Sequence, residues 1–457
     1  MFKKYQHIHF VGIGGIGMSG IAQVLLTLGY SVSGSDLKRS AVTAQLAKRG
    51  AKIMIGHKKE NIGSAHVVVI SSAVHDDNSE VKAAKEKAIP VVPRAEMLAE
   101  LMRLKYGIAV AGTHGKTTTT SLIATILAAA GLDPTMVIGG KVNSFRTNAK
   151  LGKGEYLVAE ADESDRSFLK LSPTIAVITN IDPEHMENYR DFGHVLETYA
   201  SFANKVPFYG VVVACSDHPE IKKLLPEISR KVVTYGIDSG DFRAEGVVQK
   251  GPVMEFEVKE SGKVLGNVSL AAPGMHNVLN ALAAVAVAKE LDIPFAKIRQ
   301  GFAKFKGIER RFQILRSGND SPTIVTDYAH HPSEIEAVLS AAKKGWPGKR
   351  IICVMQPHRF TRLSSLFAGF VSALSIPDVV VLLPVYAAGE KPVDAVTART
   401  LFDSLAKNRG GNNRTLYAEE KGEMFNACRK MASSSDIILF LGAGDIWKMA
   451  KEFAKQI

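Results

Sequence analysis

Short apolar runs that end in glycine or polar residues recur along the chain, and each is followed by a stretch with the spacing of a helix. The clearest case is the run from Gly107 to Ala111, which predicts a buried strand. The Ala-, Leu- and Ile-rich stretch from Thr117 to Ala130 then predicts a helix. Strands that alternate with helices in this way indicate an α/β fold with parallel sheets.

A glycine-rich turn joins that strand to that helix, with the sequence GTHGKTT. Glycine lets backbone N–H groups close around phosphate oxygens, the helix N-terminus adds positive charge, and a Lys and a Thr can bind phosphate and Mg²⁺. The turn departs from the usual phosphate-loop pattern, because Val110 stands where the first glycine is expected. We expect nucleotide phosphates to be bound by Gly112, Thr113, His114, Gly115, Lys116, Thr117 and Thr118.

A second glycine-rich turn, GIGGIG, follows a predicted strand at His7–Val11 and precedes an apolar helix from Met18 to Leu28. With Asp36 about 20 residues further on, this is the dinucleotide-binding fingerprint, which favours a bound diphosphate; a purely structural turn is the alternative. Asp36 is expected either to accept hydrogen bonds from a ribose or base or to cap the next helix. The predicted ligand-binding residues here are Gly12, Gly14, Gly15, Gly17, Asp36 and the strand-end pair Ser71 and Ser72.

Two predicted strands of the middle region end in acidic residues. The run from Tyr156 leads into Glu160 and the acids after it, and the run from Ile175 to Thr179 leads to His185. P-loop enzymes place metal ligands at such strand ends, so Thr117, Glu160 and His185 are the candidate metal ligands. A solvated acidic loop is the alternative, and it carries more weight for Glu163 and Asp165 than for Glu160.

Residues 217–270 show alternating patterns and turns that predict a β-rich insertion, and a long Ala- and Val-rich helix follows. Near its start Asn277 is expected either to contact an adenine edge or to act as a cap. Residues 307–312 contain Arg310, which we include among the nucleotide-binding residues, and predict a hinge.

The last third predicts strands at 323–326, 351–355, 379–383 and 437–441, each ending in polar residues or glycine, which indicates another α/β layer. Pro332 suits the first turn of a helix. Arg359 and Arg362 are expected on one side of a helical turn, where they would bind a carboxylate or a phosphate; two surface arginines are the alternative.

Composition narrows the functional classes. The net charge is +12, and residues 1–106 hold 15 basic against 8 acidic residues, yet no basic run is interleaved with aromatics as in nucleic-acid-binding modules. We therefore expect no nucleic-acid partner. No apolar run is long enough to span a membrane and no signal peptide is apparent, which predicts a cytoplasmic protein without membrane insertion. Three widely spaced cysteines, Cys215, Cys353 and Cys428, indicate buried thiols.

Eight motifs stand in a fixed order: the first glycine loop, GTHGKTT, EADESD, TNIDPEHM, GMHNVLNALAA, DYAHHP, QPHRFTR and LGAGDIW. In this order they resemble the Mur ligases over essentially the whole chain. The resemblance implies an α/β protein of three domains, at residues 1–106, 107–312 and 313–457. These would be a Rossmann-like domain for a UDP-sugar, a P-loop ATPase-type domain with a parallel sheet and β-rich insertion, and a Rossmann-like domain for an amino acid.

The resemblance also implies an activity and residue roles. The activity would be the ATP- and Mg²⁺-dependent addition of L-alanine to the carboxylate of UDP-N-acetylmuramate through an acyl phosphate, in peptidoglycan precursor synthesis. The Gly12–Gly17 loop would then hold UDP rather than NAD, and no lysine stands in EADESD or TNIDPEHM, as in the alanine-adding branch. The implied catalytic residues are Lys116, Glu160 and His185; Asn277 and Asp327 would contact ATP; and Tyr328, His330, Arg359 and Arg362 would bind the alanine side. A monomer or a homodimer is expected.

Overall fold

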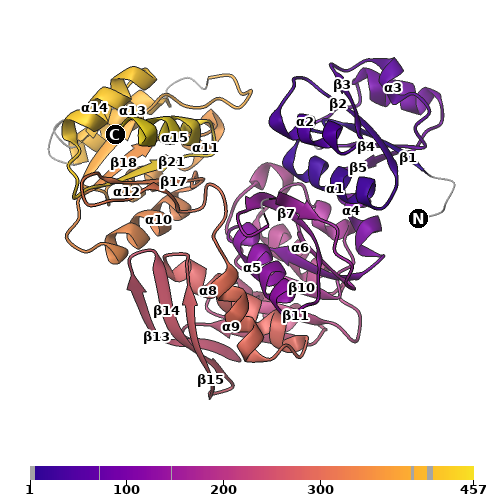
Figure 1. Ribbon diagram of the computed structural model, residues 1–457, viewed down its shortest axis with the longest axis horizontal. Helices are drawn as coiled ribbons and strands as arrows, with labels where there is room; N and C mark the ends of the chain where they lie inside the picture. Colours follow the sequence, from indigo (N-terminus) through magenta and orange to yellow (C-terminus); the bar gives the residue numbers. More distant parts are fainter. Residues whose placement is uncertain (1–5, 72, 146, 393–395, 409–414) are drawn as a thin grey trace. The chain divides into compact units, whose positions relative to one another are not determined.

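The computed structural model describes residues 6–71, 73–145, 147–392, 396–408 and 415–457, so Ser72 lies outside the described residues. The chain forms two compact units, which are described separately (Figure 1). Unit 1 contains residues 1–246, 256–268 and 279–306, and unit 2 contains residues 247–255, 269–278 and 307–457. In the parts of the chain that the structure covers, no helix has the length and apolar character needed to cross a membrane.

Unit 1 begins with a five-stranded sheet of order β3-β2-β1-β4-β5, in which every neighbouring pair is parallel. This order has the switch point next to β1 at which Rossmann-type sheets bind ligands. The predicted βαβ unit is confirmed. The elements are β1 (His7–Val11), α1 (Ile16–Thr27), β2 (Ser31–Asp36), α2 (Ala41–Lys48), β3 (Lys52–Ile55), β4 (Val67–Ile70), α3 (Ser79–Glu86), β5 (Val91–Pro93) and α4 (Arg94–Met102).

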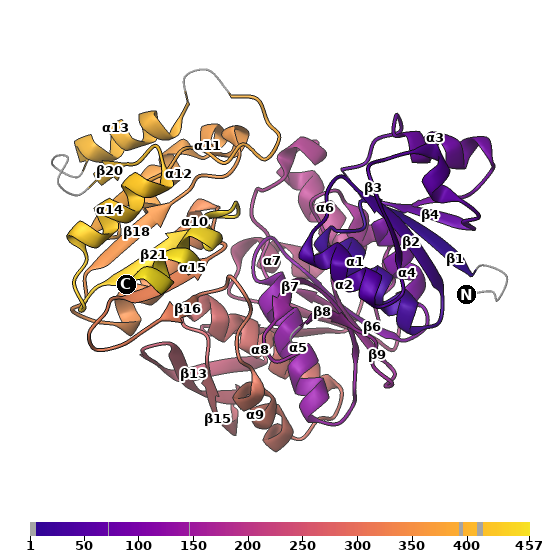
Figure 2. The same cartoon turned by 45° about the horizontal axis from the view of Figure 1, so that its top comes forward.

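The central sheet has ten strands in the order β15-β14-β13-β12-β11-β10-β6-β9-β7-β8. Strands from β12 to β7 in this order run parallel, and β8 is antiparallel to β7, so the sheet is mixed. Figure 2 shows α5 beside this sheet, and α1 contacts β7 and β8. The strands are β6 (Tyr106–Ala111), β7 (Thr135–Val142), β8 (Thr147–Lys150), β9 (Tyr156–Glu160), β10 (Ile175–Ile178), β11 (Val211–Cys215), β12 (Val232–Gly236), β13 (Phe242–Lys250), β14 (Val253–Glu260) and β15 (Lys263–Leu270).

The helices of this region are α5 (Lys116–Ala129), α6 (Phe192–Ala203), α7 (Pro219–Leu224), α8 (Met275–Glu290) and α9 (Phe295–Lys304). The prediction of strands over residues 217–270 is confirmed for β12 to β15, which extend the central sheet. It is wrong for α7. There Pro219 occupies the first helical turn, and Ile221 and Leu224 are buried at helical spacing, which the alternating pattern of the later strands obscured.

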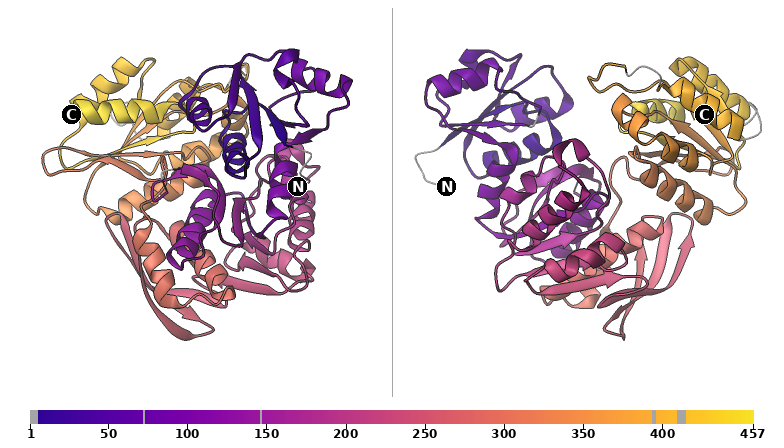
Figure 3. Two further views of the ribbon diagram at one scale, coloured as in Figure 1. Left: turned by 45° about the vertical axis from the view of Figure 1, so that its right-hand side comes forward. Right: turned by 180° about the vertical axis from the view of Figure 1, so that it is seen from behind.

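The C-terminal sheet of unit 2 has the order β16-β17-β21-β18-β19-β20, parallel except for β16 against β17. Its central strands are buried on both faces. Side chains of α10, α12 and α13 cover one face, and those of α14 and α15 cover the other. Figure 3 shows helices, in orange and yellow, around this sheet. The elements are β16 (Gln313–Arg316), β17 (Thr323–Asp327), α10 (Pro332–Gly345), β18 (Ile351–Met355), α11 (Phe360–Ser365), α12 (Phe367–Ala373), β19 (Val379–Leu382), α13 (Ala398–Asn408), β20 (Thr415–Tyr417), α14 (Lys421–Met431), β21 (Ile437–Leu441) and α15 (Ile446–Gln456).

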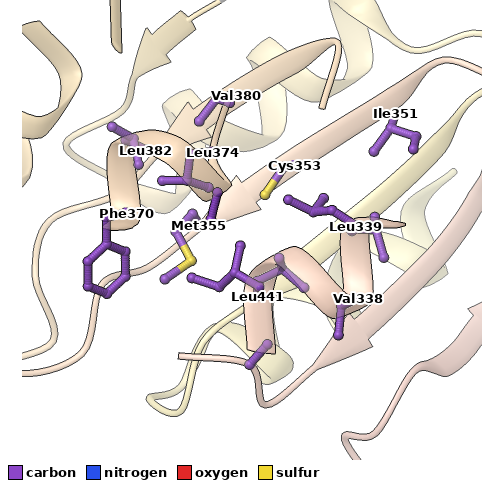
Figure 4. Packing of buried hydrophobic residues seen from close by; sticks show 14 of the residues in the cluster. Val338, Leu339, Ile351, Cys353, Met355, Phe370, Leu374, Val380, Leu382 and Leu441 are labelled. Atoms are coloured by element: carbon purple, nitrogen blue, oxygen red, sulfur yellow. The ribbon is translucent and has the colours of Figure 1, made fainter. Parts of the chain in front are cut away.

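Figure 4 shows the first of these faces, where Leu339 and Phe370 pack against Cys353 and Met355 of β18. Because neither face of the strands meets water, their sequences are continuous apolar runs, which is why the sequence predicted β18 and β21 residue for residue. All three cysteines are buried free thiols, as expected.

Candidate functional site

The phosphate loop lies between β6 and α5, where the sequence placed it. Gly112 has φ +133°, and a Cβ there would overlap the Thr179 hydroxyl; Gly115 has φ +82°, and a Cβ there would overlap the side chain of Asn280. Only glycine adopts these angles without strain and leaves room for its neighbours. Gly115 is also the N-cap of α5 and provides no side-chain cap, so the first N–H groups of the helix have no side-chain acceptor from that position.

Residues that follow β10 hold this loop in shape. The Asn180 side-chain oxygen accepts the His114 N–H at 2.7 Å, and the Thr179 hydroxyl donates to the His114 carbonyl at 2.6 Å. The Thr113 hydroxyl oxygen accepts the Asp182 N–H at 2.8 Å. The loop conformation is therefore fixed by the neighbouring strand, a role that the sequence pattern did not reveal.

The side-chain ammonium group of Lys116 bonds to its own loop and to Glu163. Its Nζ donates to the Gly112 carbonyl at 2.5 Å and to Glu163 Oε1 at 2.7 Å. Burial alone would lower the pKa of Lys116, but the charges of Glu163, Asp162 and Glu160 outweigh it and raise that pKa. Acidic groups thus gather around the one lysine of the loop.

For Glu163 a solvated acidic loop was the alternative considered, and the structure excludes it. Its side chain is buried, at 8% exposure, and it pairs with Lys116. Burial and the charge of Asp162 raise the pKa of Glu163 to about 7, against the opposing effect of Lys116. Its Oε2 is buried and has no hydrogen-bond partner in the described part of the chain. No local pattern indicates that Glu163, 47 residues from Lys116, would contact it.

The predicted metal ligands are Thr117, Glu160 and His185, and in the described residues they do not form a preformed metal site. Glu160 Oε1 accepts the Gly139 N–H at 2.6 Å. His185 has φ +56° and lies 3.7 Å from Glu187 and 3.9 Å from Glu184. Within the described ranges, no group of three or more His, Cys, Asp or Glu side chains could hold a metal ion. The roles of Thr117, Glu160 and His185 as metal ligands stay predictions.

The first glycine loop is closed by strand β2. Gly12 N–H donates to the Ser35 carbonyl at 2.9 Å, and Asp36 Oδ2 accepts the Gly14 N–H at 2.8 Å. The alternative that Asp36 caps the next helix is wrong, because Ser40 caps α2 with a complete capping box. Ser71 Oγ lies 3.4 Å from the position that a Cβ of Gly12 would take, so the strand-end serine borders the loop.

Arg94 is a site residue that the sequence motifs do not indicate. It is the first residue of α4, and its Nη2 donates to Asp162 Oδ2 at 2.9 Å. Asp162 stands directly before Glu163, so this ion pair joins helix α4 to the acidic loop. No motif marks Arg94 in the sequence; only the position of α4 against the loop after β9 shows it.

In unit 2, Asp327 and Arg310 are held by backbone groups. Asp327 is buried and accepts the N–H groups of Phe312 at 2.6 Å and Ala329 at 2.7 Å, while burial raises its pKa. Arg310 donates to the Ala443 carbonyl at 2.9 Å and lies over the Tyr328 ring at 4.4 Å. The expected hinge shows left-handed backbone at Gly307, Arg310 and Phe312.

The predicted amino-acid-binding residues lie around His358, which was not among the predicted site residues. The His330 ring contacts the Tyr328 ring edge-on at 5.2 Å and the His358 ring at 6.0 Å, and His358 stacks on Tyr386 at 5.5 Å. Burial, His330, Arg362 and Arg359 lower the pKa of His358 to about 4, so this imidazole is neutral at pH 7. The neutral imidazole of His358 therefore lies among aromatic rings and close enough to Arg359 and Arg362 for their charges to act on it.

Arg359 and Arg362 were expected on one helical turn, but this is wrong. Arg359 precedes α11 as its N-cap, with φ +70°. Its Nε lies 3.4 Å from Glu390 Oε1. Arg362 is in α11 itself. Asn277 donates from its side chain to the Pro273 carbonyl at 2.7 Å, and its proposed contact with adenine stays a prediction.

Comparison with protein families covers nearly the whole chain. Residues 7–106 match the model of the Mur ligase family, catalytic domain; residues 110–288 match the Mur ligase middle domain; and residues 310–444 match the Mur ligase, glutamate ligase domain. The three models therefore follow one another in the order of the three sheets.

Individual relatives agree over their full lengths. The chain is 52% identical to the UDP-N-acetylmuramate--L-alanine ligase of Geotalea uraniireducens, over 100% of this chain and 99% of the relative. It is also 52% identical to the enzyme of that name from Geobacter sulfurreducens, with the same coverage. The crystal structure of the UDP-N-acetylmuramate-alanine ligase of Thermotoga maritima superimposes with a TM-score of 0.84 and 31% identity, covering 98% of both chains.

Proposed function

Because the chain belongs to the Mur ligase family, we propose that it is an ATP-dependent ligase that joins L-alanine to the carboxylate of UDP-N-acetylmuramate. The observation that carries this proposal is the phosphate loop, in which Lys116 and an uncapped helix N-terminus stand beside strand-end acids. The full-length similarity to relatives of that name supports the choice of substrates. We propose the domains at residues 1–106, 107–312 and 313–457.

The first step makes the carboxylate reactive. A carboxylate is a poor electrophile, so its oxygen attacks the γ-phosphorus of ATP, the bond to the β-phosphate oxygen breaks, and an acyl phosphate and ADP form. Lys116 leaves Glu163 for the phosphate oxygens and stabilises the charge that develops there. The N–H groups at the start of α5 bind the same oxygens.

Mg²⁺ fits the donors that are present. It is typically bound by one or two carboxylates together with phosphate oxygens and water, so a preformed protein cage is not required. Thr117 in the first turn of α5, the Glu160 carboxylate and His185 would hold it, and bound there it would neutralise charge on the β- and γ-phosphate oxygens. The buried Glu163 Oε2, which lacks a partner in the described part of the chain, adds a further oxygen donor nearby.

The second step forms the amide. The neutral amine of L-alanine attacks the acyl carbonyl, a tetrahedral oxyanion forms, and phosphate leaves with the electrons of the C–O bond. Arg359 and Arg362 would bind the alanine carboxylate through charge-assisted hydrogen bonds. Tyr328, His330 and the neutral His358 would surround the small side chain. Excluding water is essential, since it would hydrolyse the acyl phosphate.

Replacing Lys116 tests the assignment. Lys116→Ala removes the charge that binds the phosphates, so formation of UDP-N-acetylmuramoyl-alanine, followed by mass spectrometry with ATP and Mg²⁺, should fall by at least about 10³-fold. Lys223→Ala, which removes an exposed lysine of α7 in the same region, is the matched control and should keep wild-type rates. Near-normal product formation by a folded Lys116→Ala protein would refute the phosphate-loop assignment.

A further inference from the structure

One arginine of unit 1, Arg94, contacts both the first glycine loop and the acidic loop that follows β9. Arg94 Nη2 donates to Asp162 Oδ2 at 2.9 Å, with side-chain exposures of 23% and 38%. The same guanidinium lies next to the last glycine of the first loop, because a Cβ built on Gly17 would be 3.0 Å from Arg94 Nη1 and 3.1 Å from its Cδ. The absence of a side chain at Gly17 thus makes room for Arg94.

This position places a cation at the positive end of a helix. Gly15 is the N-cap of α1, Gly17 is in its first turn, and neither a side-chain cap nor an acidic residue is present there. A cation near a helix N-terminus is unfavourable by itself, while an anion is favourable. Asp162 and Asp36, whose carboxylate accepts the Gly14 N–H, offset part of this cost, and a diphosphate on the Gly12–Gly17 loop would offset more of it.

The other end of the contact leads to the phosphate loop. Asp162 Oδ1 accepts the N–H and the hydroxyl of Ser164, so its side chain is fixed in the loop after β9. The next residue, Glu163, pairs with Lys116 at 2.7 Å. Arg94 is therefore separated from the phosphate-loop lysine by two neighbouring acids.

The Arg94–Asp162 pair is not needed to hold the N-terminal sheet to the central one. Gln23 donates to the Ala149 carbonyl at 2.5 Å, Asn148 donates to the Ile16 carbonyl at 3.0 Å, and Lys170 pairs with Glu96 at 3.1 Å. These contacts already fasten α1 and α4 to the central region. The Arg94–Asp162 pair is therefore expected to have a role other than fastening these elements together.

We propose that Arg94 is a positioning residue that links the two nucleotide sites: it binds the diphosphate of the sugar nucleotide on the Gly12–Gly17 loop and, through Asp162, sets the acidic loop beside Lys116. This proposal rests on the proposed function, which supplies the UDP-sugar. Because linkage is reciprocal, a change on the acidic loop must alter sugar-nucleotide binding, although Asp162 is not part of the glycine loop.

Calorimetric titration of the full chain with UDP-N-acetylmuramate, without ATP, measures this linkage. Arg94→Ala should weaken binding about tenfold, since a charge-assisted contact to a phosphate is lost, and Arg94→Lys should restore part of it. Asp162→Asn should weaken binding about threefold, and the double variant should bind no worse than Arg94→Ala alone, because the two residues act as one unit. In steady-state assays Arg94→Ala should raise the KM for ATP more than it lowers kcat.

Lys170→Ala is the matched control, because it removes an ion pair between α4 and the same central region that involves neither Arg94 nor Asp162. It should leave the Kd within about twofold of the wild-type value. Unchanged Kd values for folded Arg94→Ala or Asp162→Asn would overturn the linkage. If the wild-type chain itself did not bind UDP-N-acetylmuramate, the proposed function would fail instead, so the two failures are distinct.

Discussion

At the scale of single residues, buried charge decides what each side chain can do. Lys116 and Glu163 form a buried pair, and the charges of Asp162 and Glu160 also face the lysine. In the proposed function, an incoming polyphosphate would therefore meet several acids around one lysine, so binding without accompanying cations would be disfavoured.

His358 gives a residue-scale prediction for stability against pH. Its folded pKa, about 4, lies below the ordinary value of 6.5, so the folded protein binds fewer protons than the unfolded chain between these values. The stability that the neutral imidazole contributes is present above pH 6.5 and is lost as the pH falls toward 4.

Replacing His358 with a residue that does not titrate should flatten this dependence. Between pH 7.5 and 5.0, His358→Gln should lose about 1 kcal/mol less stability than the wild-type protein, as measured by thermal unfolding at both pH values. The exposed His75 serves as control, and His75→Gln should keep the wild-type slope. An equal slope for His358→Gln and the wild type would contradict the assigned pKa.

At the scale of elements, the strand–loop–helix unit around α5 depends on two glycines with left-handed backbone at opposite ends. Gly112 has φ +133° and no space for a Cβ, whereas Gly131, after the end of α5, has φ +86° and nothing within 4 Å of a built Cβ. An alanine at Gly131 would therefore meet only the cost of a left-handed backbone, whereas an alanine at Gly112 would also overlap its neighbours.

The two alanine variants should therefore differ. Gly131→Ala should cost about 1 kcal/mol and leave nucleotide binding intact, because only the left-handed conformation is penalised. Gly112→Ala should displace the loop from Thr179 and Asn180 and lower ADP affinity by at least about tenfold, which fluorescence or calorimetric titration can measure. Equal ADP affinities for Gly112→Ala and Gly131→Ala would show that the loop tolerates the displacement.

The elements also show how far sequence patterns reach. Strands β18 and β21 were predicted exactly, because strands buried on both faces are continuous apolar runs. Helix α7 was missed because its six residues are too few to establish a helical period beside β-type alternation. The contacts of Glu163 and Arg94 join residues 47 and 68 positions apart in the chain, and no local pattern encodes such pairings.

At the scale of the whole molecule, three sheets of α/β type follow one another, and the three Mur ligase models match them in order. The basic excess of residues 1–106 suits a domain that binds a diphosphate, while the acids around Lys116 suit a site that receives metal and nucleotide together. The distribution of charge thus agrees with a ligase of anionic substrates.

The most direct test of this account is phosphate release from ATP and Mg²⁺ with UDP-N-acetylmuramate, comparing L-alanine with the murein tripeptide as the amine. The account predicts release with L-alanine, dependence on both acceptor substrates, and a product heavier by one alanyl residue. Release with the tripeptide alone would assign the chain to the peptide-recycling branch of the family. No release with either amine would contradict the proposed ligase activity.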